Sequence, residues 1–210
     1  MVMGGKTKTV GRDVTVGEVM KEVERDRAYF RRSGGGLTLS GGESLMQPEF
    51  AIALLKSAKN AGLTTAMEST AFADFSVIER YLPYLDTYLM DIKHTDSAKH
   101  EVFTGRPNGK ILENARKIAE YGGVELVIRT PVIPGFNATK EEIAAIAQYA
   151  STLKGVKRMH ILPYHRIGSD KYAGLGRKYE LEGVEPPSKE LMNELAEVVK
   201  SFGLDCQIGG

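Results

Sequence analysis

The sequence is poor in cysteine and has no tryptophan. Its 210 residues include a single cysteine, Cys206. One thiol excludes an internal disulfide and is compatible with a reducing compartment, so we expect a cytoplasmic protein. Cys206 lies in the C-terminal tail, and we assign it no function.

An excess of charge of one sign is also missing. Lys and Arg number 28 against 27 Asp and Glu, which gives a net charge of +1. We therefore expect no nucleic-acid partner and no anionic membrane surface as partner. No apolar run approaches the roughly 18 residues that a membrane-spanning helix needs. Residues 1–11 lack the apolar stretch of a secretory signal.

What is present suits one domain over residues 1–210, with residues 1–12 as a flexible extension. The hydrophobic content of 42% is enough for a sizeable core. Helical and strand-like patterns alternate, and the patterns Thr15-x-x-Glu18 and Thr139-x-x-Glu142 predict capping boxes at helix starts. We expect strands over residues 36–40, 63–67, 88–92, 126–129 and 159–162.

Such alternation predicts an α/β fold with a parallel sheet and helices outside it. The first element is a helix with no strand ahead of it, whereas a helix in this class normally follows an earlier strand. We interpret this as a missing first strand. A fold that begins with a helix is the alternative.

Polar residues follow every expected strand. In parallel α/β sheets the ligand lies at the carboxyl ends of the strands, an edge that we call the rim. The residue groups at this edge are Ser40–Glu43, Glu68–Thr70, Asp91–Lys93, Arg129–Pro131 and Pro163–His165. Five such groups in the same position predict one shared pocket.

The first of these groups is a glycine loop. Gly36-x4-Gly41 is similar to the start of a phosphate loop, but Gly42 and Glu43 stand where that loop has Lys and Ser or Thr. A carboxylate there repels phosphate and favours a cationic group such as an ammonium. Gly41 and Gly42 would let the backbone approach a ligand closely. A plain tight turn is the alternative.

Two acidic residues lie on neighbouring strands. Glu68 and Asp91, together with Ser69, could hold a cation by oxygen ligands. The alternative is an ion pair with Lys93 or Arg129. A histidine, His165, could bond a ligand hydroxyl or have only a structural role. The other three histidines show no zinc-type spacing.

Several motifs in one order carry a family resemblance. They are SGGGLTLSGGE, YLDTYLMDIKH, TGRPNGKILENARK, VIRTPVIPGFN and MHILPYHRIGSDKYAGLGRKYEL. The chain resembles the radical S-adenosylmethionine (SAM) activating enzymes of glycyl-radical enzymes, the pyruvate formate-lyase activating enzyme and its relatives. This resemblance implies a partial (βα) barrel similar to a TIM barrel.

The resemblance also implies a reaction and its partners. Family members use a [4Fe-4S] cluster to cleave SAM reductively, and the resulting radical takes a hydrogen from a glycine of a partner enzyme. A flavodoxin or ferredoxin is the implied reductant. The family's cysteine motif lies on the loop after the first strand, and both the strand and the loop are missing from this sequence. Without three thiolates such a cluster has no protein anchor, so we expect the chain alone to be inactive.

The site residues can be carried over by position. Gly41, Gly42 and Glu43 match the loop that receives the methionine amino group. Other matches to cofactor-contacting or cation-binding positions are Glu68, Ser69, Asp91, Lys93, Arg129 and His165. By this resemblance, Glu68 and Asp91 together with Ser69 would surround a monovalent cation. His165 would face the ribose of SAM. Glu68 replaces an aspartate of the pyruvate formate-lyase type, and Ala71 replaces a usual glycine.

Two other functions stay open. One is a non-catalytic role, as a remnant that binds SAM or docks a glycyl-radical enzyme. The other is an unrelated barrel lyase or aldolase in which Lys93 forms a Schiff base.

Overall fold

The structure is a computed structural model. It describes residues 2–3, 6–7, 11–166, 174, 176, 179 and 181–209. The expectation of flexibility for residues 1–12 concerns positions half of which lie outside the described residues, and most positions in the second half of the last family motif also lie outside them.

Eight strands and eight α-helices are described in these ranges. The strands are β1 (Val2–Met3), β2 (Lys6–Thr7), β3 (Gly36–Leu39), β4 (Thr64–Ser69), β5 (Thr87–Asp91), β6 (Glu125–Val132), β7 (Arg158–Pro163) and β8 (Asp205–Ile208). The α-helices are α1 (Val16–Val23), α2 (Arg27–Ser33), α3 (Pro48–Asn60), α4 (Phe75–Glu79), α5 (Ser97–Thr104), α6 (Gly109–Tyr121), α7 (Lys140–Ser151) and α9 (Lys189–Ser201). Short 3₁₀ helices are η1 (Glu24–Asp26), η2 (Ser44–Met46) and η3 (Leu82–Tyr84).

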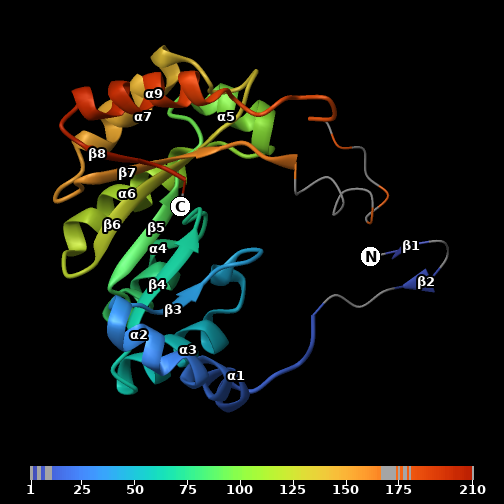
Figure 1. Ribbon diagram of the computed structural model, residues 1–210, viewed down its shortest axis with the longest axis vertical. Coiled ribbons are helices and arrows are strands. Elements are labelled where there is room, and N and C mark those ends of the chain that lie inside the picture. The colour runs from blue at the N-terminus through green and yellow to red at the C-terminus, as the bar shows by residue number, and fades with distance from the viewer. Residues whose placement is uncertain are drawn as a thin grey trace.

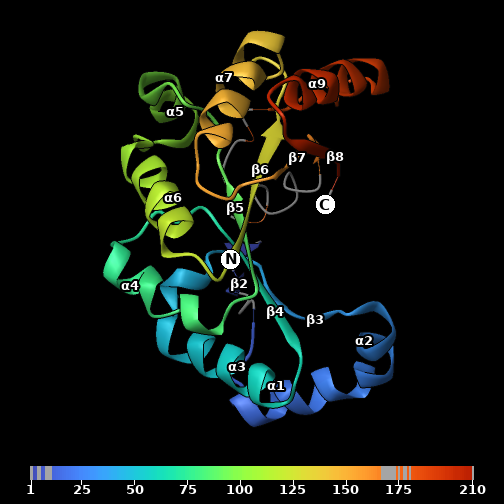
Figure 2. The same ribbon diagram turned by 90° about the vertical axis from the view of Figure 1, so that its left-hand side faces the viewer.

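Six strands form one parallel sheet in the order β3-β4-β5-β6-β7-β8. Each strand therefore pairs with its neighbour in the sequence, and right-handed crossovers of this kind place all connecting helices on one side of the sheet. Figures 1 and 2 show the helices along the outer face and the strands inside them. This arrangement confirms the expected α/β partial barrel.

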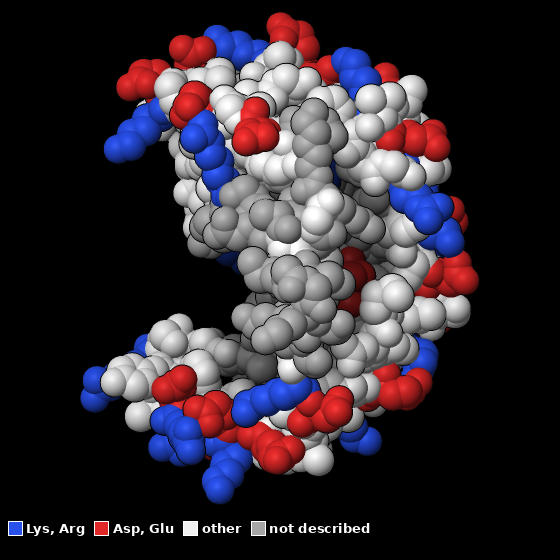
Figure 3. All heavy atoms as spheres, turned by 90° about the vertical axis from the view of Figure 1, so that its right-hand side faces the viewer, with Lys and Arg blue, Asp and Glu red and all other residues white. Residues whose placement is uncertain are grey.

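The barrel is not closed. The strands β3 and β8 lie at opposite edges of the sheet (Figure 2). Figure 3, which looks at the molecule from the opposite side, shows a deep notch in its outline. Among the described residues no strand pairs with the outer edge of β3, the edge at which we expected a further strand. The hairpin of β1 and β2 is a separate antiparallel pair.

Burial alternates along the strands, which defines the two faces of the sheet. On β4 and β5 every second residue, such as Met67, Tyr88 and Met90, is fully buried beneath the helices. The residues between them are only half-buried and face the inside of the barrel. The inner face is therefore free to carry polar groups, while the outer face supplies the core.

Local patterns explain most helix ends. Thr15 and Glu18 form the expected capping box, and Pro48 begins α3, after which Gly62 turns with φ +74°. Thr139 caps α7 by accepting a hydrogen bond from the Glu142 N–H. The reciprocal bond of the second expected capping box does not form, because the Glu142 side chain contacts His94 and Lys99 instead of the Thr139 N–H. The prediction of that capping box is therefore only partly correct. Across the described segments, no helix combines the length and the apolar character required to cross a bilayer.

One element was missed by the sequence patterns. Cys206 does not lie in a tail but in β8, where it pairs in register with Met159 of β7. Its side chain is half-buried and packs against the core. The earlier assignment of this segment as a tail is wrong.

Candidate functional site

The glycine loop after β3 brings a carboxylate to the end of β4. Gly41 has φ +92°, a conformation that glycine adopts without strain. The loop ends at Glu43, whose carboxylate accepts hydrogen bonds from the Ser69 hydroxyl at 2.6 Å and the Thr70 hydroxyl at 2.9 Å. It also accepts from the Leu45 N–H at 3.3 Å and so caps η2. Glu43 is thus held at the rim by the loop and by β4.

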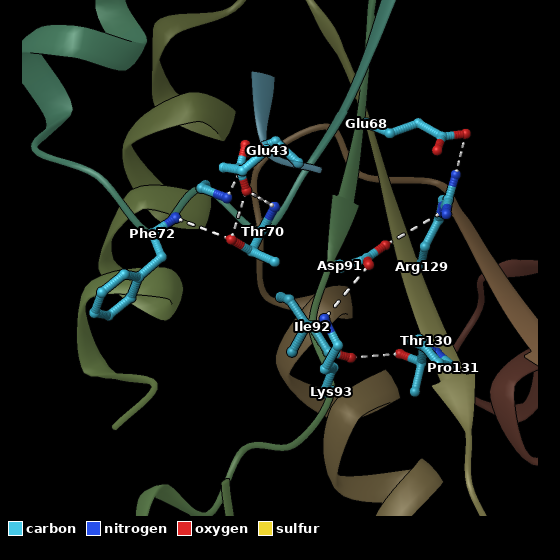
Figure 4. A network of polar contacts seen from close by, with 12 residues as sticks. Glu43, Glu68, Thr70, Phe72, Asp91, Ile92, Lys93, Arg129, Thr130 and Pro131 are labelled. Carbon is cyan, nitrogen blue, oxygen red and sulfur yellow. Dashed lines mark hydrogen bonds and ion pairs between the residues drawn. The ribbon is translucent and has the colours of Figure 1, made fainter. Parts of the chain in front are cut away.

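A second cluster of charged residues spans three strands on the inner face. Arg129 Nη1 of β6 lies 2.6 Å from the carboxylate of Glu68, and its Nε lies 3.3 Å from Asp91. Lys93 Nζ lies 3.5 Å from the other oxygen of Asp91. The Ser40 hydroxyl donates to Glu68 at 2.6 Å and so links this cluster to the glycine loop. Figure 4 shows these side chains beside Glu43 at one end of the sheet.

The cluster balances two carboxylates against two cations. Partial burial raises the pKa of Glu68, but the hydrogen bonds from Ser40 and Arg129 outweigh it, and the net pKa is lowered. Glu68 is therefore ionised at neutral pH. Asp91 Oδ1 and Arg129 Nε are buried, yet neither has a hydrogen-bond partner among the described residues. These two buried atoms face each other as an ion pair at 3.3 Å without hydrogen-bond geometry.

The side-chain oxygens of Glu68, Ser69 and Asp91, which we proposed as ligands of a cation, do not converge on one point in the structure. Glu68 and Asp91 both contact Arg129, as in the alternative interpretation. The Ser69 hydroxyl donates to Glu43 instead of lying beside Glu68. Neighbouring residues of a strand point to opposite faces, which separates these two side chains. The described contacts therefore favour the ion pairs over a monovalent cation.

The remaining predicted residues lie near the rim. Gly42 is exposed, and a side chain at this position would meet open space. His165 follows β7 at the rim and is exposed, and within the described part of the chain it makes no hydrogen bond. Lys93 lies on the inner face, where its Nζ forms an ion pair with Asp91 at 3.5 Å.

Sequence reasoning missed one histidine of the inner face. His160 on β7 is the register partner of Arg129, so their side chains share a face of the sheet. Burial and the neighbouring arginines Arg158 and Arg129 lower the pKa of His160, which is therefore neutral at pH 7. The alternation along β7, counted from its pairing with β6, would have placed it in the site.

A cavity of about 610 Å³ opens beside the glycine loop. Its walls are residues 12–14, the end of β3, the loop residues Gly42 and Glu43, and α3. A second cavity of about 760 Å³ lies between α9 and β8 and includes Cys206. The first of these two cavities is lined by Ser40, Gly42 and Glu43 of the glycine loop, so we take it as part of the candidate site, although Glu68, Asp91, Lys93 and Arg129 do not line it.

The described residues fit SAM but not an iron–sulfur cluster. An amino acid ligand needs an acceptor for its ammonium and cations for its carboxylate, and the rim offers Glu43 on one side and Arg129 and Lys93 on the other. A cluster with three protein thiolates needs three cysteines, and this chain has one. That cysteine lies on β8, and among the described residues no group of three or more His, Cys, Asp or Glu side chains is arranged to hold a metal ion.

Comparison with known proteins agrees with this fold. The model of the radical SAM superfamily matches residues 4–161. The isethionate sulfite-lyase activating enzyme of Desulfovibrio desulfuricans is 46% identical over 80% of this chain and 54% of its own length. The pyruvate formate-lyase-activating enzyme of Staphylococcus epidermidis is 37% identical over 94% of this chain and 81% of its own length.

A solved structure gives the same result. The crystal structure of a domain of pyruvate-formate lyase-activating enzyme from Bacteroides vulgatus superposes with a TM-score of 0.69. It is 32% identical and covers 84% of this chain and 99% of that one.

The open parallel barrel with its polar rim thus defines a ligand-binding α/β barrel of the radical SAM type. The chain belongs to the radical SAM superfamily and, within it, to the glycyl-radical enzyme activating enzymes. It spans little more than half the length of the isethionate sulfite-lyase activating enzymes that it matches.

Proposed function

We propose that this chain is the SAM-binding barrel of a glycyl-radical enzyme activating enzyme. The observation that carries the proposal is the convergence, at one rim, of the Glu43 carboxylate and the cluster of Glu68, Arg129, Asp91 and Lys93. These side chains come from four loops or strands, and family motifs mark three of them, with Glu68 on β4 outside the motifs. The names of the relatives support a glycyl-radical enzyme as the protein substrate.

Different rim residues would bind different chemical groups of SAM. Glu43 and the exposed backbone of Gly41 and Gly42 would receive the methionine ammonium. Arg129 and Lys93 would receive the methionine carboxylate, because both place cationic side chains at the rim. We assign His165 to the ribose. SAM held here would supply the 5′-deoxyadenosyl group, and its reductive cleavage would need a [4Fe-4S] cluster that the single cysteine of this chain cannot hold.

The same geometry argues that these 210 residues do not cleave SAM alone. They hold one cysteine, and its thiol lies on β8. We therefore assign the chain SAM binding and docking of the partner, and assign the cluster to residues that the chain does not contain. A flavodoxin or ferredoxin would reduce that cluster in the cytoplasm.

Titration of the folded chain with SAM by isothermal calorimetry tests the binding. We expect saturable binding that Glu43→Gln and Arg129→Gln weaken by tenfold or more. The matched control is Glu49→Gln, because Glu49 is an exposed glutamate that pairs with Arg80 on the surface. A folded chain that shows no saturable binding at millimolar SAM would contradict the proposal.

A second experiment tests the inactivity. The chain is reconstituted with iron and sulfide without oxygen and then reduced in the presence of SAM. We expect no 5′-deoxyadenosine. If 5′-deoxyadenosine forms with a reducible cluster, the chain holds a cluster by other ligands and this part of the proposal is wrong.

The non-catalytic alternative is favoured by the single cysteine. In that case the chain binds SAM or the glycyl-radical enzyme and takes no part in cleavage. Adding a cysteine-bearing segment from a relative separates the two functions. Restored cleavage supports the activating enzyme, and its absence with intact SAM binding supports the non-catalytic role.

A further inference from the structure

One family motif contributes no side chain to the ligand site. The stretch TGRPNGKILENARK covers residues 104–117, and most of it lies in α6 on the outer face of the sheet. Two of its polar residues are nevertheless almost completely buried, with Asn108 and Asn114 each 2% exposed. A buried amide must find hydrogen-bond partners, so the question is which groups these two side chains bind.

Asn114 binds the loop that follows β4. Its Nδ2 donates to the carbonyl of Ala71 at 2.8 Å and to that of Ala73 at 2.9 Å. Ala71 has φ +55°, a left-handed conformation that is strained for any residue with a side chain. Ala71 follows Thr70 directly, and Thr70 holds the Glu43 carboxylate. Asn114 thus fixes a strained backbone next to one half of the site.

Asn108 binds the loop that follows β5 in the same way. Its Nδ2 donates to the carbonyl of His94 at 2.7 Å and to that of Thr95 at 2.9 Å. His94 comes directly after Lys93, so this amide sets the course of the chain as it leaves the site.

A third asparagine, Asn137 of the VIRTPVIPGFN motif, joins two strand ends and is fully buried. Its Nδ2 donates to the carbonyl of Lys93 at 2.8 Å and to that of Pro131 at 2.9 Å. Its Oδ1 accepts from the Ile133 N–H at 2.7 Å, which satisfies all the hydrogen-bonding groups of the amide.

The bonds of Asn137 begin where the sheet ends. The ladder between β5 and β6 closes with the Ile92 N–H donating to the Arg129 carbonyl at 2.9 Å. Beyond it, the two ends are joined by Asn137 and by Thr130, whose hydroxyl donates to the Ile92 carbonyl at 2.8 Å. Figure 4 shows Thr130 and Ile92 directly below the pair of Asp91 and Arg129.

These three side chains share one geometry: each amide bridges two carbonyls in the loops that leave β4, β5 and β6. Only a planar group with two donors makes such a bridge, because aspartate would place a charged oxygen against the carbonyls. We propose that Asn108, Asn114 and Asn137 are positioning residues that fix the rim backbone in its ligand-binding shape before the ligand arrives. This inference rests on the proposed binding of SAM at the rim.

Asn137 offers the sharpest test, because it joins the two strand ends that carry Asp91, Lys93 and Arg129. The variant Asn137→Ala is compared with Val199→Ala, which removes buried volume from α9 and touches neither strand end. Calorimetry gives the SAM affinity of each. We expect Asn137→Ala to weaken binding by tenfold or more and Val199→Ala to change it by less than twofold.

A second measurement needs no ligand. Hydrogen exchange of the Ile92 and Ile133 amides is followed in the ligand-free chain and compared with exchange of core amides on α7. Positioning predicts that Asn137→Ala loses protection at Ile92 and Ile133 beyond the loss on α7. A purely structural role predicts a loss shared by the whole sheet.

The outcomes separate the two proposals. If the wild-type chain fails to bind SAM, the proposed function fails and the exchange data alone decide the positioning role. If Asn137→Ala binds SAM like the wild type, or if both variants lose affinity in proportion to their stability, the positioning role is overturned. If Asn137→Ala does not fold, the near-isosteric Thr130→Val removes one bond between the same strand ends and must show the same two effects.

Discussion

Asp91 and Arg129 lie opposite each other in register on β5 and β6, yet Asp91 Oδ1 and Arg129 Nε, 3.3 Å apart, form no hydrogen bond. Arg129 gives its close contact to Glu68 instead, at 2.6 Å. Arg129 is thus the cation that two carboxylates, Glu68 and Asp91, share. Substitution of Arg129 therefore measures what this shared cation contributes to stability.

Replacing Arg129 with methionine leaves both carboxylates without their shared cation. The Arg129 side chain is 13% exposed and that of Glu68 is 32% exposed, so water screens the loss only in part. We expect Arg129→Met to lower the free energy of unfolding by about 1–3 kcal/mol, as for other charged hydrogen bonds. Urea unfolding followed by circular dichroism measures this.

The double variant Arg129→Met with Glu68→Gln is the control for that prediction. It removes one of the unpaired charges, so it should recover part of the lost stability. If the two single changes simply add, the 2.6 Å contact between Arg129 and Glu68 contributes no coupling energy.

Gly36 marks the closest approach of two strands. A Cβ added to it would lie 1.9 Å from the carbonyl oxygen of Thr64, which is backbone and cannot move aside. We expect Gly36→Ala to disrupt the pairing of β3 with β4 and to destabilise the chain by at least about 2 kcal/mol. Gly42→Ala is the matched control, because a Cβ there meets open space. Thermal unfolding of both variants is the measurement, and equal melting temperatures would contradict the role of Gly36.

The stability of the chain should fall in acid through Asp86. Burial raises the pKa of Asp86, but hydrogen bonds from Lys59 and from the Thr65 N–H outweigh it and lower the net pKa below its ordinary 3.8. A carboxyl with a depressed folded pKa stabilises the protein above its unfolded pKa, and this contribution disappears as pH falls through the folded value. Because Asp86 is partly exposed, we expect a modest effect.

The measurement is urea unfolding of the wild type and of Asp86→Asn between pH 7 and pH 2. The wild type should be the more stable at pH 7, and the two curves should converge as the pH falls through the lowered folded pKa of Asp86 and the carboxyl becomes protonated. A difference that stays constant over this range would show that ionisation of Asp86 does not contribute.

The sequence patterns predicted five of the six strands of the parallel sheet. They also predicted the edge of the sheet at which the polar residue groups lie. Alternate residues of the predicted runs, such as Tyr88, Met90 and Ile92, are buried on the outer face, and the polar groups that follow the strands lie at one edge, as parallel strands require. The patterns did not predict β8, because its segment Asp205–Ile208 contains one charged residue, one amide and only two apolar residues. Its pairing with β7 is a long-range feature that no local pattern encodes.

Side-chain partners were less predictable than strands. Thr139 and Glu142 have the same spacing as Thr15 and Glu18, but only the earlier pair forms a capping box. Glu142 instead contacts Lys99 and lies 2.7 Å from Nε2 of the buried His94. These partners lie more than 40 residues away in the sequence, and they compete with the local bond. Carboxylate partners of this kind are set by tertiary packing.

The single thiol provides a last prediction. Burial against α9 raises the pKa of Cys206 to about 11. Only the thiolate reacts with disulfide reagents, so at pH 7.5 the folded chain should react far more slowly than a chain unfolded in urea. The rate should rise with pH up to about 10 as long as the fold persists. Absorbance with an aromatic disulfide reagent follows the reaction, and equal rates for folded and unfolded chains would show that the contacts of Cys206 on β8 do not protect it.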